Sequence, residues 1–373
     1  MRIDSGPRGG YDCRRAWPLA LPRNPRSPQV LTAMSSAEPV IAADNLTRVF
    51  STYRKREGLL GSLRSFVRRE FAQKTAVDAV SFRIERGELV GFLGPNGAGK
   101  TTTLKLLSGI LHPTSGGATV LGHVPWRREP VFQRRISIVM GQKNQLWWDL
   151  PAMDSFLLNR DVYQIPERDF RARLDELNAL FELEDLTRQP LRKLSLGERM
   201  KCELIGSLLH RPEVLFLDEP TIGLDVVTQK RLREFIGEYG RRTGVTTILT
   251  SHYMRDIEEL CKRAIIIDHG RIMYDGALRD LIQAHATHKL IEVQFTQDVP
   301  LAACSRFGEV TECDGLRATL RVERDRVPLV AGDLLRELPV ADISIVETSA
   351  EEVIRGLFAE RGSAAWALEE GTP

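Results

Sequence analysis

The sequence has few cysteines, no long apolar run and almost no net charge. Its 373 residues include five cysteines, which form neither a Cys-x-x-Cys pair nor a Cys/His spacing of the kind that binds zinc. Scattered thiols in odd number argue against a disulfide framework and are typical of a reducing cytosol. No stretch of about 18 apolar residues occurs, which excludes a helix that spans a membrane.

The charges nearly cancel. Lys and Arg number 52 against 50 Asp and Glu, which gives a formal net charge of +2. Dedicated nucleic-acid binders have strongly basic surfaces, so we expect no nucleic-acid partner. The balance conceals two basic segments: residues 1–34 carry six basic and two acidic side chains, and residues 51–74 carry seven and two.

Residues 1–38 are predicted to be a disordered extension. They are rich in proline, glycine and arginine and have no helical or strand period. Two prolines interrupt the apolar residues 16–22, which argues against a secretion signal, although Arg14-Arg15 faintly suggests a twin-arginine signal. Met34 is the expected start of the natural reading frame.

The basic insertion, residues 51–74, contains a predicted amphipathic helix at 58–71. Its apolar side chains recur at helical spacing, at Leu59, Leu63, Phe66, Val67 and Phe71. Such a helix can contact anionic lipid headgroups or a protein partner. A solvated helix that lies on its own domain is the alternative.

The clearest motif is a phosphate-binding loop between a predicted buried strand, residues 89–93, and a predicted helix, residues 100–111. The loop fits G-x-x-x-x-G-K-[ST] and consists of Gly94, Pro95, Asn96, Gly97, Ala98, Gly99, Lys100, Thr101 and Thr102. Glycines let backbone N–H groups surround phosphate oxygens, and the helix N-terminus adds positive potential. We expect Lys100 to reach the β- and γ-phosphates and the Thr101 hydroxyl to bind Mg²⁺.

A second predicted buried strand ends in two carboxylates, Asp218 and Glu219. In a parallel sheet the carboxyl ends of the strands face the ligand crevice. Asp218 is therefore expected to hold Mg²⁺ through water, and Glu219, which points in another direction, to polarise an attacking water. A pair of solvated carboxylates is the alternative.

Further motifs surround these two in a fixed order: Gln142 after a predicted strand, Leu194-Ser195-Leu196-Gly197-Glu198, Gly223-Leu224-Asp225, and His252. Over residues 39–285 this order resembles the ATP-binding subunit of ABC transporters. The resemblance implies an α/β P-loop NTPase fold, with a RecA-like core, an antiparallel β subdomain and a helical subdomain at about 143–210. Alternating short strands and helices predict a small α+β domain at 286–362, before a tail at 363–373.

The resemblance also implies roles. Gln142 would contact Mg²⁺ and the attacking water, and His252 would touch the γ-phosphate. Ser195 and Gly197 would complete the ATP site of a second subunit in a head-to-tail dimer, expected to be a homodimer, and Asp225 would connect the two sites. The implied catalytic residues are Glu219, His252 and Gln142, and the implied Mg²⁺ ligands are Thr101, Gln142 and Asp218.

Some positions depart from the family pattern or match it loosely. Leu196 and Glu198 replace a glycine and a glutamine of the usual Leu-Ser-Gly-Gly-Gln, and they bring a side chain and a negative charge toward phosphate. Both changes predict a weaker composite site. The adenine base in this family stacks on an aromatic near the end of the first strand, for which Phe50 is the first candidate and Tyr53 the second. A core aromatic is the alternative for Phe50.

The implied partner is a separate transmembrane permease, which would hold the chain at the cytoplasmic face of the membrane, with help from residues 51–74. The Gln142 segment, this insertion and the C-terminal domain resemble exporter-type members. Adjacent Trp147 and Trp148 cannot both face one core, so we expect this segment to grip a short permease helix. Packing within the helical subdomain is the alternative.

Two other functions stay open. A soluble ABC-type ATPase that acts on DNA or ribosomes is disfavoured, because the chain has one phosphate loop and little room for an inserted module between Gln142 and Ser195. A nucleotide-binding scaffold with impaired hydrolysis is motivated by Leu196 and Glu198.

Overall fold

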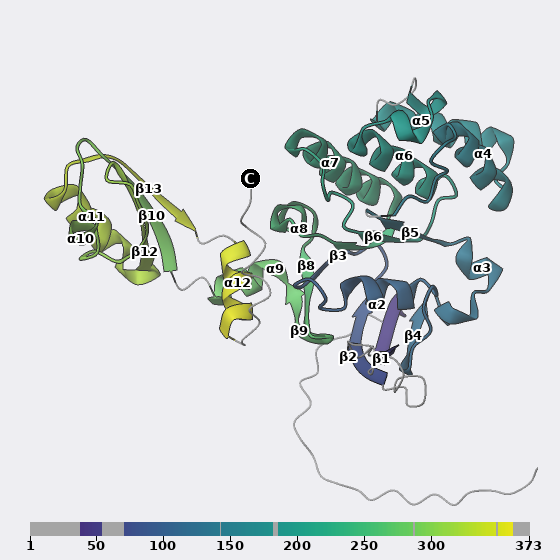
Figure 1. Cartoon of the computed structure of the whole chain (residues 1–373), viewed down its shortest axis with the longest axis horizontal. Helices are drawn as coiled ribbons and strands as arrows, with labels where there is room; N and C mark the ends of the chain where they lie inside the picture. Colours follow the sequence, from purple (N-terminus) through teal and green to yellow (C-terminus); the bar gives the residue numbers. More distant parts are fainter. Residues whose placement is uncertain are drawn as a thin grey trace, which may run out of the picture. The chain divides into compact units, whose positions relative to one another are not determined.

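The computed structural model describes residues 38–53, 71–141, 143–181, 186–285, 288–347 and 350–360. These residues form three sheets and their helices (Figure 1). Most of the N-terminal extension, the centre of the basic insertion, Gln142 and the tail lie outside them. In this part of the chain no helix is long and apolar enough to cross a bilayer.

A six-stranded sheet in the order β5-β6-β7-β3-β8-β9 lies at the centre of the larger domain. Its first five strands are parallel, and β9 runs antiparallel to β8. Alternate side chains of β6 enter different apolar cores. Leu215 and Leu217 are buried in the core on one face of the sheet, and Val214 and Phe216 are buried in the core on the other face, as expected for a sheet covered on both faces. The strands are β3 (Leu89–Leu93), β5 (Ile136–Met140), β6 (Val214–Asp218), β7 (Thr246–Thr250), β8 (Arg263–Asp268) and β9 (Arg271–Ala277).

A three-stranded antiparallel sheet has the order β2-β1-β4, with β1 (Ile41–Tyr53), β2 (Phe71–Ile84) and β4 (Ser115–Val120). The pairing of β1 with β2 continues to Tyr53 opposite Phe71. Both ends of the basic insertion are therefore strands, because ladder hydrogen bonds satisfy their backbone groups. Phe71, which we expected in the helix at 58–71, begins β2 instead, and residues 58–70 lie outside the described part.

Helices cover both faces of the six-stranded sheet. Figure 1 shows α2 and the antiparallel sheet on one side and α4 to α7 on the other. The expected helix 100–111 ends at Leu107, because Gly109 turns the chain with a φ of +77°. The helices of this domain are α2 (Lys100–Leu107), α3 (Pro130–Gln133), α4 (Ala152–Val162), α5 (Glu167–Phe181), α6 (Leu196–Leu208), α7 (Val226–Thr243), α8 (Met254–Leu260) and α9 (Leu278–His285), with 3-10 turns η1 (Pro125–Arg127), η2 (Leu186–Arg188) and η3 (Leu191–Lys193).

The C-terminal domain is α+β, as expected. Its antiparallel sheet has the order β11-β12-β10-β13, and it has its own apolar core. Cys304 and Cys313 in this domain are free thiols. The elements are β10 (His288–Phe295), α10 (Leu301–Cys304), β11 (Glu309–Cys313), β12 (Arg317–Glu323), η4 (Arg324–Arg326), α11 (Val327–Glu337) and β13 (Val340–Glu347).

The last described helix, α12 (Ala350–Glu360), packs on the larger domain. Ile354 and Phe358 are fully buried in the same core as Ile257 of α8. The backbone N–H of Ala350 donates to Glu258 of α8 at 3.2 Å. The boundary expected at 286–362 placed this helix in the C-terminal domain, but its apolar face is buried on α8 and α9.

Candidate functional site

A hollow of about 250 Å³ lies over the turn from β3 into α2. It brings together parts of the chain that are far apart in sequence: the end of β1, the start of β2, the phosphate loop and the end of β6. Its lining residues are Phe50, Lys74, Ala76, Asn96, Gly97, Ala98, Gly99, Lys100, Thr101, Thr102 and Glu219. Phe50 is half-buried there, with the Arg48 guanidinium 4.7 Å from its ring centre.

The backbone of the loop requires glycine at two positions. Gly94 has a φ of +156°, and a Cβ there would lie 2.1 Å from the carbonyl oxygen of Ile267. Gly99 has a φ of +111°, and its Cβ would lie 2.3 Å from the carbonyl oxygen of Ala76. Gly99 also precedes α2 without a side-chain cap, so the first turn of α2 is open to an anion.

Lys100 is buried beneath the loop. Its Nζ donates to the carbonyl oxygens of Gly94 at 2.6 Å and Pro95 at 3.2 Å. A buried ammonium needs such partners, and phosphate oxygens are stronger ones than neutral carbonyls. The loop therefore holds a fixed positive charge where the sequence predicts phosphate.

Asp218 lies at the carboxyl end of β6, next to Thr101. Its Oδ1 accepts hydrogen bonds from Thr101 Oγ1 at 3.1 Å and from Thr250 Oγ1 at 2.8 Å. A hydroxyl and a carboxylate oxygen this close form a donor set that suits Mg²⁺. We did not predict Thr250, although it is the β7 residue that pairs directly with Asp218 in the parallel ladder.

Glu219 and His252 meet at the edge of the hollow. The Nε2 atom of His252 lies 2.9 Å from Glu219 Oε1. Burial raises the pKa of Glu219, but the hydrogen bond from His252 and the charges of His252 and Lys100 outweigh it, so that this pKa lies below its usual value. The Glu219 backbone has a φ of +55°, a left-handed conformation that is uncommon outside glycine.

Ser195, Gly197 and Asp225 form a second cluster, which does not line the hollow. Ser195 caps α6, because its Oγ accepts from the Glu198 backbone N–H at 3.3 Å. In return, the hydroxyl and the backbone N–H of Ser195 both donate to Glu198 Oε2 at 2.8 Å. A Cβ on Gly197 would lie 2.7 Å from Thr228, whose hydroxyl donates to Asp225 at 2.6 Å. Hydrogen bonds from Thr228 and Val227 lower the pKa of Asp225, which caps α7. Gln142 lies outside the described residues.

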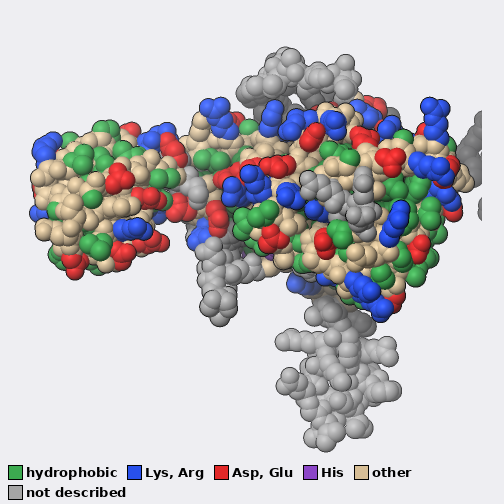
Figure 2. Space-filling view, turned by 90° about the horizontal axis from the view of Figure 1, so that it is seen from above, with side chains coloured by type: hydrophobic (Ala, Val, Ile, Leu, Met, Phe, Trp, Pro, Cys, Tyr) green, Lys and Arg blue, Asp and Glu red, His purple; other side chains and the backbone are tan. Residues whose placement is uncertain are grey.

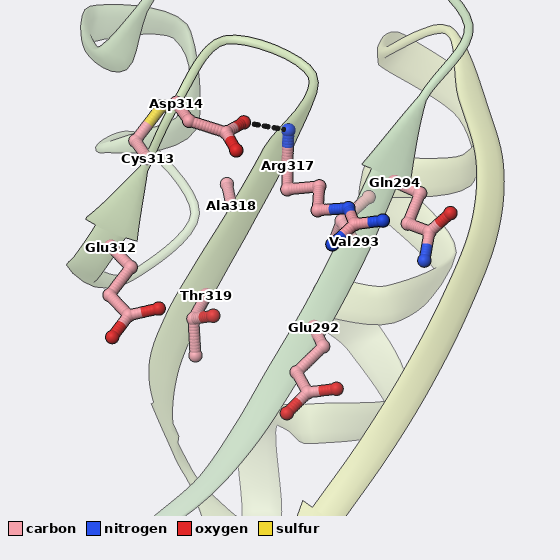
Figure 3. A pocket seen from close by; sticks show the side chains of 9 residues that line it. All are labelled: Glu292, Val293, Gln294, Glu312, Cys313, Asp314, Arg317, Ala318 and Thr319. Atoms are coloured by element: carbon pink, nitrogen blue, oxygen red, sulfur yellow. Dashed lines mark hydrogen bonds between the residues drawn. The ribbon is translucent and has the colours of Figure 1, made fainter.

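A larger hollow, of about 600 Å³, lies on the C-terminal domain (Figure 3). Three carboxylates and Arg317 line it, and the Arg317 backbone N–H donates to Asp314 at 2.7 Å. In the part of the chain that the structure covers, no group of three or more His, Cys, Asp or Glu could hold a metal ion. Figure 2 shows charges of both signs interspersed over the face it presents.

Comparison with known proteins identifies the family to which this chain is similar. Residues 77–222 match the family model described as ABC transporter, and residues 287–346 match the EvrA-like ABC transporter, C-terminal domain. The chain is 35% identical over 254 residues to the Nod factor export ATP-binding protein I of Burkholderia pseudomallei, which covers 67% of the chain and 82% of that protein. It is 33% identical over 215 residues to the ABC transporter ATP-binding protein NatA of Bacillus subtilis, which covers 58% of the chain and 87% of that protein.

Solved structures agree on the fold. An ATP-binding subunit of an ABC transporter covers 66% of this chain and 92% of its own, with a TM-score of 0.55 and 23% identity. A dimeric ATP-binding cassette with bound ADP and Pi covers 64% of this chain and 99% of its own, with a TM-score of 0.53 and 21% identity. The family model over residues 77–222, together with the 35% identity to a curated relative over 82% of its length, shows that the chain belongs to the ABC transporter ATP-binding protein family and is an ATPase.

Proposed function

We propose that this chain powers export through a separate membrane permease, at the cytoplasmic face of the membrane, as one half of an ATP-closed homodimer. The observation that carries the proposal is that Lys100 and Glu219 line one hollow, while Asp218 contacts its lining residue Thr101 and His252 contacts Glu219. Support for export comes from the similarity to a Nod factor export ATP-binding protein.

Binding of ATP would use the loop as it is folded. The Lys100 ammonium would exchange its two carbonyl partners for phosphate oxygens, and the α2 N-terminus would face the same charges. Phe50 would stack on adenine, with Lys74 beside it in the lining.

Thr101 and Asp218 would hold Mg²⁺, together with Gln142. The fit rests on the adjacent hydroxyl and carboxylate oxygens at the carboxyl end of β6. A bound Mg²⁺ would supply charge neutralisation on the phosphates. Thr250 would fix the carboxylate orientation from the next strand.

Glu219 would accept a proton from the attacking water. Its lowered pKa keeps the carboxylate ionised at neutral pH, as a base requires. His252 would hold the Glu219 carboxylate in place through the 2.9 Å contact and face the γ-phosphate.

A second copy would complete the site. Ser195, Gly197 and Asp225 lie away from the hollow of their own chain, which leaves them for the ATP of a partner subunit. The capped N-terminus of α6 would then face that phosphate. Light scattering on the Glu219→Gln variant tests this: we expect a dimer with ATP and a monomer without it. A monomer in saturating ATP contradicts the dimer.

The permease contact is proposed at an apolar patch beside α4. Trp147 and Trp148 are 51% and 42% exposed, and Trp147 lines a small hollow together with Leu158 of α4, which is 40% exposed. Exposed aromatic side chains of this kind are typical anchors for a partner. Residues 51–74 are proposed as a second contact.

Co-purification of the permease tests the patch. Trp147→Ala and Trp148→Ala are expected to reduce the permease recovered with the tagged chain and to leave ATP binding unchanged. Leu329→Ala, at a 64% exposed residue of α11, is the control. Unchanged recovery with both Trp variants contradicts the proposed contact.

A further inference from the structure

A buried carboxylate lies behind the Glu219–His252 pair. Asp256, on α8, is 0% exposed. Its Oδ2 accepts hydrogen bonds from Thr221 Oγ1 at 2.5 Å and from Ser251 Oγ at 2.6 Å. Its Oδ1 accepts from Arg233 at 2.8 Å. A carboxylate at this depth is stable only with such partners, and here they come from three different segments.

Both hydroxyl donors lie within two residues of a member of the pair. Ser251 directly precedes His252, and its Oγ also accepts from the backbone N–H of Tyr253 at 3.0 Å. The Ser251 hydroxyl therefore fixes the chain on both sides of His252. Thr221 is the second residue after Glu219, with Pro220 between them. One carboxylate thus ties together the two loops that carry Glu219 and His252.

The Glu219 backbone needs this support. A non-glycine residue with a φ of +55° stays in that conformation only where its surroundings hold it. On the N-terminal side, the Glu219 N–H donates to the Thr250 carbonyl at 3.1 Å. On the C-terminal side, the Ile222 N–H donates to the Glu219 carbonyl at 3.3 Å, and the Thr221 hydroxyl is bound to the buried Asp256 carboxylate.

Arg233 extends the junction to α7. It is 2% exposed, and besides Asp256 it donates to Glu259 at 2.7 Å. The helix that carries Arg233 is capped at its N-terminus by Asp225, the residue proposed to face the second subunit. The carboxylate of Asp256 thus fixes α7 relative to the two loops.

We propose that Asp256 is a positioning residue for ATP hydrolysis: through Thr221 and Ser251 it holds Glu219 and His252 in their mutual contact, without touching ATP. The proposal rests on the roles proposed above for Glu219 and His252. Misplacement of a reacting group by a single ångström costs up to about 100-fold in rate, so loss of this junction acts on turnover rather than on ATP binding.

A double-mutant cycle tests it on the full-length chain, with turnover expressed per ATP-binding site. Asp256→Asn keeps the shape and removes the charge that Arg233 requires. We expect kcat to fall about 10-fold, with KM for ATP changed less than about twofold. In a His252→Ala background the same substitution is expected to reduce kcat less than about twofold further, because His252→Ala has already removed the contact between Glu219 and His252 that Asp256 positions.

Two further variants keep the test decisive. Thr221→Val removes one hydroxyl donor at nearly constant volume and is expected to show the same non-additivity with His252→Ala. Glu258→Gln, on the same helix but in contact with α12, is expected to keep the wild-type kcat.

Each outcome has one meaning. If Asp256→Asn and Thr221→Val reduce turnover equally in both backgrounds, they act independently of His252 and the positioning role is overturned. A wild-type kcat for both variants overturns it as well. If His252→Ala alone keeps the wild-type kcat, the role proposed for His252 fails first, and the positioning role falls with it.

Discussion

Protonation of His210 is expected to destabilise the fold between pH 6.5 and pH 4. The ring stacks on Tyr163 with centroids 3.9 Å apart, and Nε2 lies 3.0 Å from the carbonyl oxygen of Ile136. Because a carbonyl oxygen only accepts, Nε2 carries the proton of the neutral ring. The Nδ1 atom is buried without a partner, so an added proton there has no acceptor.

The direction of the pH effect on stability follows from the shift in the pKa of His210. Burial is the main cause that lowers the pKa of His210 from 6.5 to about 4. The charge of Arg173 lowers this pKa further, and the hydrogen bond to Ile136 raises it. The unfolded chain therefore binds a proton below pH 6.5 that the folded chain takes up only near pH 4. Stability due to neutral His210 is complete above pH 6.5 and is lost as the pH falls. Between pH 7 and pH 4.5 the loss amounts to about 2.5 kcal/mol.

Urea unfolding at both pH values measures this loss. His210→Gln is the matched variant, because its amide can still donate to Ile136 but does not titrate. We expect the free energy of unfolding of the wild type to fall by about 2.5 kcal/mol more than that of the variant. Carboxylates that titrate in this range contribute equally to the pH dependence of both proteins, so their contribution cancels in the comparison. Equal pH dependence of the two proteins refutes the reasoning.

Three other substitutions test the packing and the two clusters. Phe358→Ala is expected to cost about 3–5 kcal/mol in urea unfolding if α12 belongs to the larger core, whereas Leu335→Ala, at a 55% exposed residue, is expected to cost less than about 0.5 kcal/mol; equal costs contradict the packing. Gly94→Ala is expected to abolish ATP binding in calorimetry, because its Cβ would lie 2.1 Å from Ile267 oxygen. Glu198→Gln keeps the acceptor for Ser195 and removes the negative charge, so light scattering is expected to detect dimers at a lower ATP concentration than for the wild type. This difference between the two proteins is expected to shrink at high salt, which screens the charge. A higher ATP requirement in the variant contradicts a repulsive role for Glu198.

Local patterns predicted the strand and helix on either side of residues 94–99 and the buried strand that ends at Asp218, and the structure has these elements there. Strand, loop and helix are contiguous there, and the glycines of the loop are required by its backbone. The relation of Asp218 to Thr250 was not predicted, because it depends on which strands are neighbours in the sheet. Asp256 escaped notice for a similar reason: it looks like an ordinary acidic residue of a short helix, and its partners come from separate segments. The apolar face of α12 was visible in the sequence, but the core that buries it was not.

ATP turnover by the Glu219→Gln variant tests the central claim most directly. The account predicts that the variant binds ATP as the wild type does and hydrolyses it about 10²- to 10⁴-fold more slowly, because a buried base beside His252 is lost. Glu234→Gln, which changes an exposed carboxylate of α7, is the control and is expected to keep the wild-type rate. Equal turnover in the wild type and Glu219→Gln would contradict the account.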